Sequence, residues 1–142
     1  MRQWFYQSCT EYGYWQNAYH DSTITVRSTL VNPAYHRGVC RRLFNLLDPA
    51  PVVAMNHKFY EPLLDPQMSS RVLFVNGARD PWSTLSINEI NHNNTNALHS
   101  TFMIEEGSHC DDFSPDMTSD SESLKTARQL VLQKMKEWLK IY

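Results

Sequence analysis

The chain has 142 residues and a net charge of -2, with 42% hydrophobic and 20% charged residues. Its length is close to the roughly 150 residues typical of one domain. Because there is no excess of positive charge to hold a phosphate backbone, we do not expect nucleic acid as a partner. An aromatic content of 12% favours a globular chain over a disordered one, since such a chain buries enough apolar surface to offset its ordering entropy.

The sequence gives no sign of a membrane span, a metal site or a cofactor. No apolar run approaches the roughly 20 residues that span a bilayer, and the first residues do not resemble a secretory signal. The cysteines Cys9, Cys40 and Cys110 are too few and too widely spaced for a disulfide scaffold or a CxxC metal site, but they permit one bridge and one free thiol. The six histidines show no paired ligand spacing, so we expect no metal.

The first half of the chain carries weak periodicity. Residues 1–20 are crowded with aromatic side chains, which follow neither a helical nor an alternating period. Between residues 21 and 67, five prolines break the chain into short pieces, of which residues 35–47 are the best helix candidate. We therefore expect residues 1–67 to form an aromatic-rich helical or irregular segment.

The second half favours an α/β arrangement. Residues 72–75 are a continuous apolar run bounded by turn residues, typical of a strand covered on both faces in a parallel sheet. Residues 100–104 are a second strand candidate, and residues 82–90 between them are expected to form a helix. The order strand, helix, strand is the unit of an α/β fold with a right-handed crossover.

The chain ends in an amphipathic pattern that predicts a helix of about five turns. Apolar residues recur at steps of three and four, at Leu124, Ala127, Val131, Met135 and Trp138. Ser119 is followed three residues later by Glu122, a capping-box pattern that marks the expected start of the helix.

A candidate functional carboxylate, Asp80, follows the first expected strand. In open α/β sheets, functional groups gather at the carboxyl ends of strands. Gly77 allows a sharp turn, and Pro81 disfavours helical dihedrals at Asp80, so the carboxylate is presented from an extended loop. A carboxylate fixed in this way can orient a histidine. The alternative is that Asp80 only caps the helix that begins near Trp82.

A candidate general base, His109, follows the second expected strand on a Gly-Ser-His loop. In that role Asp80 would hold the other ring nitrogen of the imidazole. The order Asp then His matches the order Ser, Asp, His of α/β hydrolases. No Gly-x-Ser-x-Gly elbow occurs in the chain, which suggests that the nucleophile lies upstream. The alternative is a surface histidine among acidic residues.

Three motifs also match a known family in the right order. They are residues 2–11 (RQWFYQSCTE), 72–82 (VLFVNGARDPW) and 106–110 (EGSHC). These motifs resemble the lysosomal Pro-X carboxypeptidase and dipeptidyl peptidase II family of serine peptidases, and within it the thymus-specific serine protease branch. The resemblance implies the C-terminal part of an α/β-hydrolase fold, with parallel strands and flanking helices. It divides the chain into residues 1–67, which join an insertion domain to the core, and residues 68–142, which belong to the core.

The resemblance also assigns roles to single residues. It implies that Asp80 and His109 are the catalytic aspartate and histidine. Trp82 would help to wall a pocket for a proline-like side chain, although a plain core aromatic is the alternative. The family pattern further implies a disulfide between Cys9 and Cys40.

The function implied is that of a serine exopeptidase which cleaves peptides beside proline. The chain would be its C-terminal part, with the N-terminal part of the same protein as partner and supplier of the serine. The intact protein is expected to form a homodimer and to be lysosomal, vesicular or secreted, and Asn93 begins a glycosylation sequon. The alternative of another class is a noncatalytic pseudoenzyme or interaction module that binds a partner through its aromatic N-terminal surface.

Overall fold

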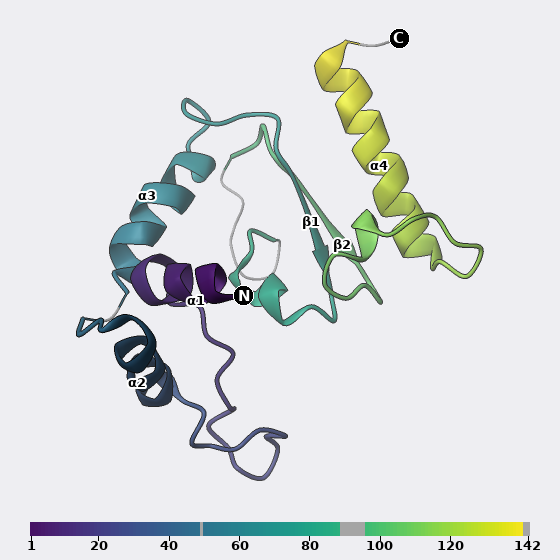
Figure 1. Ribbon diagram of the computed structural model, residues 1–142. Helices are drawn as coiled ribbons and strands as arrows, with labels where there is room; N and C mark the ends of the chain where they lie inside the picture. The colour runs from purple at the N-terminus through teal and green to yellow at the C-terminus, as the bar shows by residue number, and fades with distance from the viewer. Residues whose placement is uncertain (49, 89–95, 141–142) are drawn as a thin grey trace. The chain divides into compact units, whose positions relative to one another are not determined.

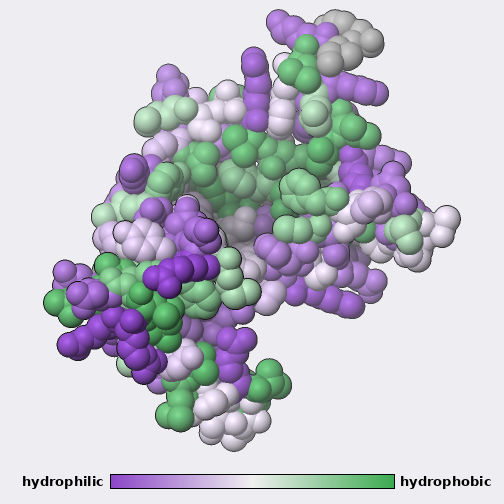
Figure 2. All heavy atoms as spheres, viewed as in Figure 1, coloured by the Kyte–Doolittle hydropathy of each residue, from purple (hydrophilic) through white to green (hydrophobic). Residues whose placement is uncertain are grey.

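The computed structural model of the protein describes residues 1–48, 50–88 and 96–140 (Figure 1). These residues form two compact units, Met1–Tyr60 and Glu61–Tyr142. Large hydrophobic side chains are exposed in both units, and Figure 2 shows such side chains on one face of the molecule. No helix in the described ranges is long and apolar enough to cross a membrane. The assignment of residues 1–67 and 68–142 to different parts of a larger fold stays a prediction.

The first unit is helical. Helix α1 (Arg2–Gln7) continues into the π-helical segment η1 (Ser8–Tyr12). Helix α2 (Pro33–Phe44) begins two residues before the expected helix, because the Asn32 side chain accepts two backbone N–H groups at its start. Helix α3 (Val52–Leu64) was not expected, since its prolines were interpreted as breaks.

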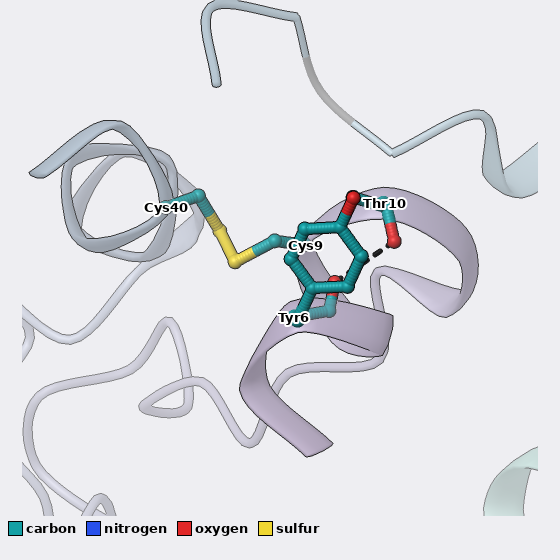
Figure 3. Close-up of a disulfide and its surroundings, with 4 residues drawn as sticks. All are labelled: Tyr6, Cys9, Thr10 and Cys40. Atoms are coloured by element: carbon teal, nitrogen blue, oxygen red, sulfur yellow. Dashed lines mark hydrogen bonds between the residues drawn. A yellow bond between two sulfur atoms is a disulfide. The ribbon is translucent and has the colours of Figure 1, made fainter. Parts of the chain in front are cut away.

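A disulfide between Cys9 and Cys40 joins η1 to α2, as the family resemblance implied (Figure 3). Both cysteines are buried, and their Cα atoms lie 5.6 Å apart. The Trp15 ring stacks on the His36 imidazole at 4.6 Å between centroids. Trp15 therefore packs on α2, the helix that the disulfide joins to η1.

The second unit is built on a parallel pair of strands. Strand β1 (Leu73–Gly77) pairs with β2 (Ser100–Ile104), so the expected parallel pairing is confirmed. A small core of Ile104, Leu124 and Ala127 joins β2 to helix α4 (Glu122–Leu139). The first three residues of β1 are only half-buried, whereas burial on both faces was expected.

Two expected details of the second unit are wrong. The helix expected at residues 82–90 is a short 3₁₀ helix, η2 (Pro81–Leu85), because the chain becomes extended at Ser86 and buries Ile87. Residues 89 and 90 lie outside the described residues.

The expected cap of the C-terminal helix is also wrong. Helix α4 starts after Ser121, whose side chain accepts the N–H of Leu124, and not at the Ser119 capping box. The physical reason is that the Asp120 carboxylate accepts the N–H of Met117, so a separate turn occupies residues 117–120 before the helix.

The loops that follow the two strands touch through glycine. A Cβ atom added to Gly77 would lie 2.5 Å from the carbonyl oxygen of Gly107. The Arg79 N–H donates to that same oxygen at 2.9 Å, and the Ala78 N–H donates to the Ile104 carbonyl at 3.0 Å. Only glycine at position 77 allows these two backbones to meet without displacement.

We predict that Gly77→Ala destabilises the protein by about 1–3 kcal/mol, because the added methyl group overlaps backbone that cannot move aside alone. Urea unfolding measures the change. Gly38→Ala is the control, since a Cβ at this helical position meets nothing within 4 Å. The control is expected to stabilise the protein by roughly 0.5–1 kcal/mol. A Gly77→Ala variant as stable as the control would refute the steric explanation.

We also predict that replacing Cys9 and Cys40 together by alanine lowers the free energy of unfolding by about 3–4 kcal/mol on the chain-entropy model. The bridge closes a loop over a sequence separation of 31 residues. Urea titrations with and without a thiol reductant check this. Cys110→Ala is the matched control, because Cys110 is an exposed free thiol. An unfolding midpoint that does not respond to reductant would contradict the prediction.

Candidate active site

Asp80 stands at the carboxyl end of β1, on a turn closed by the bond from its own N–H to the Gly77 carbonyl. Its backbone is extended, with φ -85° and ψ 117°, as expected for a residue that precedes proline. One carboxylate oxygen, Oδ1, accepts the Trp82 N–H at 2.9 Å and so caps η2. Asp80 therefore does cap the helix, as the alternative held, but only through Oδ1. Its other oxygen, Oδ2, can bind another group.

A buried amide closes the loop that carries Asp80. Asn76, on β1, donates from its side chain to the carbonyl of Ile87 at 3.2 Å. Both residues are buried. The chain from 77 to 86 thus leaves the strand and returns to it, so Asp80 is held on a loop fixed at both ends.

His109 stands at the carboxyl end of β2, on a tight turn. The Asp111 carboxylate accepts the Ser108 N–H at 2.7 Å and the Ser108 hydroxyl at 3.0 Å. The short 3₁₀ helix η3 (Asp111–Phe113) follows directly, capped at its start by Cys110 in a left-handed conformation. His109 therefore follows a residue that is bound by the Asp111 carboxylate, and it lies just before a helical turn.

The two loops bring the histidine and the aspartate together. His109 Nδ1 lies 2.8 Å from Asp80 Oδ2. The Asp80 side chain is 12% exposed and that of His109 is 63% exposed. In the tautomer of the neutral imidazole that donates Nδ1–H to the carboxylate, Nε2 is the acceptor. Within the described ranges no side chain bonds to Nε2, so this nitrogen can receive a proton from a hydroxyl group.

An arginine that the sequence reasoning missed binds the histidine loop. Arg128, on α4, forms a salt bridge with Asp120, and both side chains are largely buried. The hydrogen bond to Asp120 raises the pKa of the Arg128 guanidinium above its usual value. Bonds from the Met117 N–H and from Arg128 hold the pKa of the Asp120 carboxyl below its usual range. The run of aspartates between residues 111 and 120 was the sequence signal for a buried cation.

Of the other predicted residues, Trp82 bonds to this pair through its backbone N–H, and Asn93 is not described. Trp82 is half-buried on η2, two residues after Asp80. Asn93 lies outside the described residues. No cluster of three metal-ligating side chains occurs in the part of the chain that the structure describes. There too, no serine hydroxyl bonds to His109, so the candidate site consists of an imidazole and the carboxylate in contact with it.

Comparisons with known proteins place the chain in a family. The family model described as serine carboxypeptidase S28 matches residues 1–131. The human thymus-specific serine protease is 35% identical over 142 residues, which cover 99% of this chain and 26% of that protein. The mouse thymus-specific serine protease is 34% identical over 98% of this chain and 26% of its own length. A probable serine protease, EDA2, of Arabidopsis thaliana is 36% identical over 64% of this chain and 18% of its own length.

The aligned region is the C-terminal part of the thymus-specific proteases, so the chain spans about a quarter of the length of these relatives. No solved structure is significantly similar to the chain. S28 peptidases are α/β hydrolases, and the parallel strand pair with its flanking helices is compatible with that fold. With the family model matching nearly the whole chain, this protein belongs to the S28 family of serine peptidases.

Proposed function

We propose that this chain supplies the aspartate and histidine of a Ser-His-Asp triad in an S28 exopeptidase. The observation that carries the proposal is the 2.8 Å contact between His109 Nδ1 and Asp80 Oδ2 in a member of a serine peptidase family. His109 Nε2 takes the proton of the attacking serine and then returns it to the leaving amine. Asp80 holds the imidazole in the correct tautomer and stabilises the imidazolium that forms.

The serine of this triad belongs to a segment that precedes these residues in the full-length protein. Two observations support this placement. The chain aligns with only 26% of the human relative, at its C-terminal part. The sequence itself contains no Gly-x-Ser-x-Gly elbow in which a serine could act as nucleophile. Peptidase activity is therefore a property of the longer protein.

An apolar hollow in the second unit supports a contact with the preceding segment of the full-length protein. It has a volume of about 570 Å³ and lies between β1 and α4. Its apolar walls are Leu73, Val75, Phe113, Val131 and Leu132. Figure 2 shows hydrophobic side chains gathered over this region of the visible face. We propose that the preceding segment of the same polypeptide covers this hollow; the large share of the relatives' length outside the aligned region supports the existence of such a segment.

The substrate class that we propose is a peptide with proline next to the scissile bond. Peptides are the substrates that a serine peptidase family implies. Trp82 follows the proposed catalytic aspartate by two residues and donates its backbone N–H to that carboxylate, which supports a role for its ring beside the scissile bond. A flat aromatic face suits the rigid ring of proline. The full-length enzyme is accordingly a Pro-X carboxypeptidase or a dipeptidyl peptidase.

The compartment that we propose is lysosomal, vesicular or secreted. Disulfides form and persist in oxidising compartments and are rare in the cytosol. The buried bridge between Cys9 and Cys40 therefore supports passage through the secretory pathway. The sequon at Asn93 would be glycosylated along that route.

In the full-length protein, we predict that Asp80→Asn lowers kcat by roughly 10⁴-fold, and that His109→Ala costs at least as much. Asparagine keeps an oxygen for the Trp82 N–H but presents an NH₂ group to Nδ1, which forces the wrong tautomer. Hydrolysis of a chromogenic proline-containing peptide measures the loss. Cys110→Ala, beside His109 but exposed and unpaired, is the control and is expected to keep its activity. A His109→Ala enzyme within tenfold of wild type would eliminate the triad.

The 142-residue chain alone is predicted to hydrolyse no proline-containing peptide, since it lacks the nucleophile. The full-length protein is expected to cleave the same peptides and to lose kcat/KM when alanine replaces the proline. Amidating the C-terminus or acetylating the N-terminus of the peptide then distinguishes a carboxypeptidase from a dipeptidyl peptidase. Cleavage by the isolated chain would overturn the placement of the serine, and indifference to proline would overturn the substrate class.

A further inference from the structure

Arg128 makes five hydrogen bonds within the described part of the second unit. It stands on the second turn of α4, and its side chain is only 15% exposed. Nη1 donates to the carboxylates of Asp116 and Asp120. The remaining bonds go to backbone oxygen: Nε donates to the Asp112 carbonyl, and Nη2 donates to the carbonyls of Asp111 and Ser114. Three of its five bonds therefore hold the backbone of η3 and of the residue that ends it.

These bonds use the whole guanidinium group. Arginine has five N–H donors in a fixed planar fork, and each meets one acceptor here. Lysine has three donors at a single point and cannot reproduce this pattern. An ordinary surface ion pair involves only side chains. Arg128 in addition binds three backbone carbonyl groups, and these bonds fix the loop.

Asp111 connects this hub to the histidine. Its carbonyl oxygen accepts from Arg128 Nη2 at 3.1 Å. Its carboxylate accepts the N–H of Ser108 at 2.7 Å, and Ser108 is the residue immediately before His109. A continuous series of hydrogen bonds thus runs from Arg128 through Asp111 to the turn that carries the imidazole. On the other side, Asp80 is held by the loop that follows β1.

We propose that Arg128 is a positioning residue for His109: by fixing η3 it keeps Nδ1 within hydrogen-bond distance of Asp80 and Nε2 open to the nucleophile. The proposal rests on the proposed role of His109 in the triad. Arg128 touches neither the substrate nor the reacting atoms, and its effect passes through Asp111 and Ser108. Its loss displaces the imidazole without removing it.

The test uses the full-length protein labelled with ¹⁵N-histidine, in which the ring nitrogens of His109 report the tautomer directly. A His109→Gln variant assigns the signals. The variants compared are Arg128→Ala, Arg128→Lys and Asp111→Ala. Ser121→Ala is the matched control, because it removes the cap of the same helix without contacting the histidine loop. Kinetics on a proline-containing peptide are measured for each variant.

We expect wild type and Ser121→Ala to show the Nδ1–H tautomer, and Arg128→Ala to show a mixture. In Arg128→Ala, kcat is expected to fall roughly 10²-fold with KM changed by less than about threefold, as for a displaced catalytic group. Arg128→Lys recovers only part of the loss. Asp111→Ala is expected to reproduce the tautomer mixture with Arg128 intact, and it decides the matter if Arg128→Ala does not fold.

The proposal is overturned if a folded Arg128→Ala variant keeps the wild-type tautomer and the kcat of Ser121→Ala. If Arg128→Ala does not fold, the proposal is overturned when Asp111→Ala keeps that tautomer and that kcat. The ring-nitrogen signals do not depend on turnover. If His109 proved dispensable for activity, the proposed triad would be wrong, but the effect of Arg128 on the tautomer of His109 could still be measured. Failure of the triad and failure of the positioning role are therefore distinguishable.

Discussion

The backbone contact between Gly77 and Gly107 is the constraint on which the candidate site depends. The parallel register places Gly77 opposite Ile104, so both chains leave the sheet at the same edge. With no side chain at either glycine, the Arg79 N–H reaches the Gly107 carbonyl, and the two loops run alongside each other. Asp80 is one residue beyond this bond on its loop, and His109 is two residues beyond it on the other. Their 2.8 Å contact is a consequence of the strand register and of the absence of a Cβ atom at Gly77 and Gly107.

The capping role of Asp80 and its role toward histidine are not alternatives. A carboxylate on a flexible loop would rotate among several orientations and lose entropy when it bound an imidazole. Here the Trp82 N–H fixes Oδ1, and Pro81 fixes the backbone of the residue that carries the group. Oδ2 is thereby directed to His109 Nδ1 before any substrate is present. The cap is what pre-orients the carboxylate.

The sequence predicted features that depend on neighbouring residues. The second strand has the expected bounds, because a β-branched and aromatic run followed by Glu-Glu-Gly specifies both its conformation and its end. The helix at residues 52–64 was missed because prolines were interpreted as breaks. Pro51 precedes its first residue, and Pro62 falls within its last turn, where a proline removes few helical bonds.

The remaining errors come from long-range contacts. Ser119, Asp120 and Ser121 are three adjacent capping candidates, and local propensity does not separate them. The structure does so through Arg128, eight residues after Asp120, which pairs with that carboxylate and leaves Ser121 to cap the helix. The shortness of η2 has the same kind of cause, since burial of Ile87 draws the chain back toward β1. Neither contact has a signature in the local pattern.

Among the residues that the structure describes, the groups that set the geometry of the aspartate and histidine lie in the second unit. Asn76 holds one loop, Arg128 and Asp111 hold the other, and the glycine contact joins them. This geometry therefore does not depend on how the first unit is placed. In the proposed triad, the preceding segment of the protein needs to bring a serine hydroxyl only to Nε2, the side of the imidazole that is open. Because the carboxylate and the imidazole already stand together at one edge of the sheet, assembly of the proposed active site requires only that a nucleophile dock beside them.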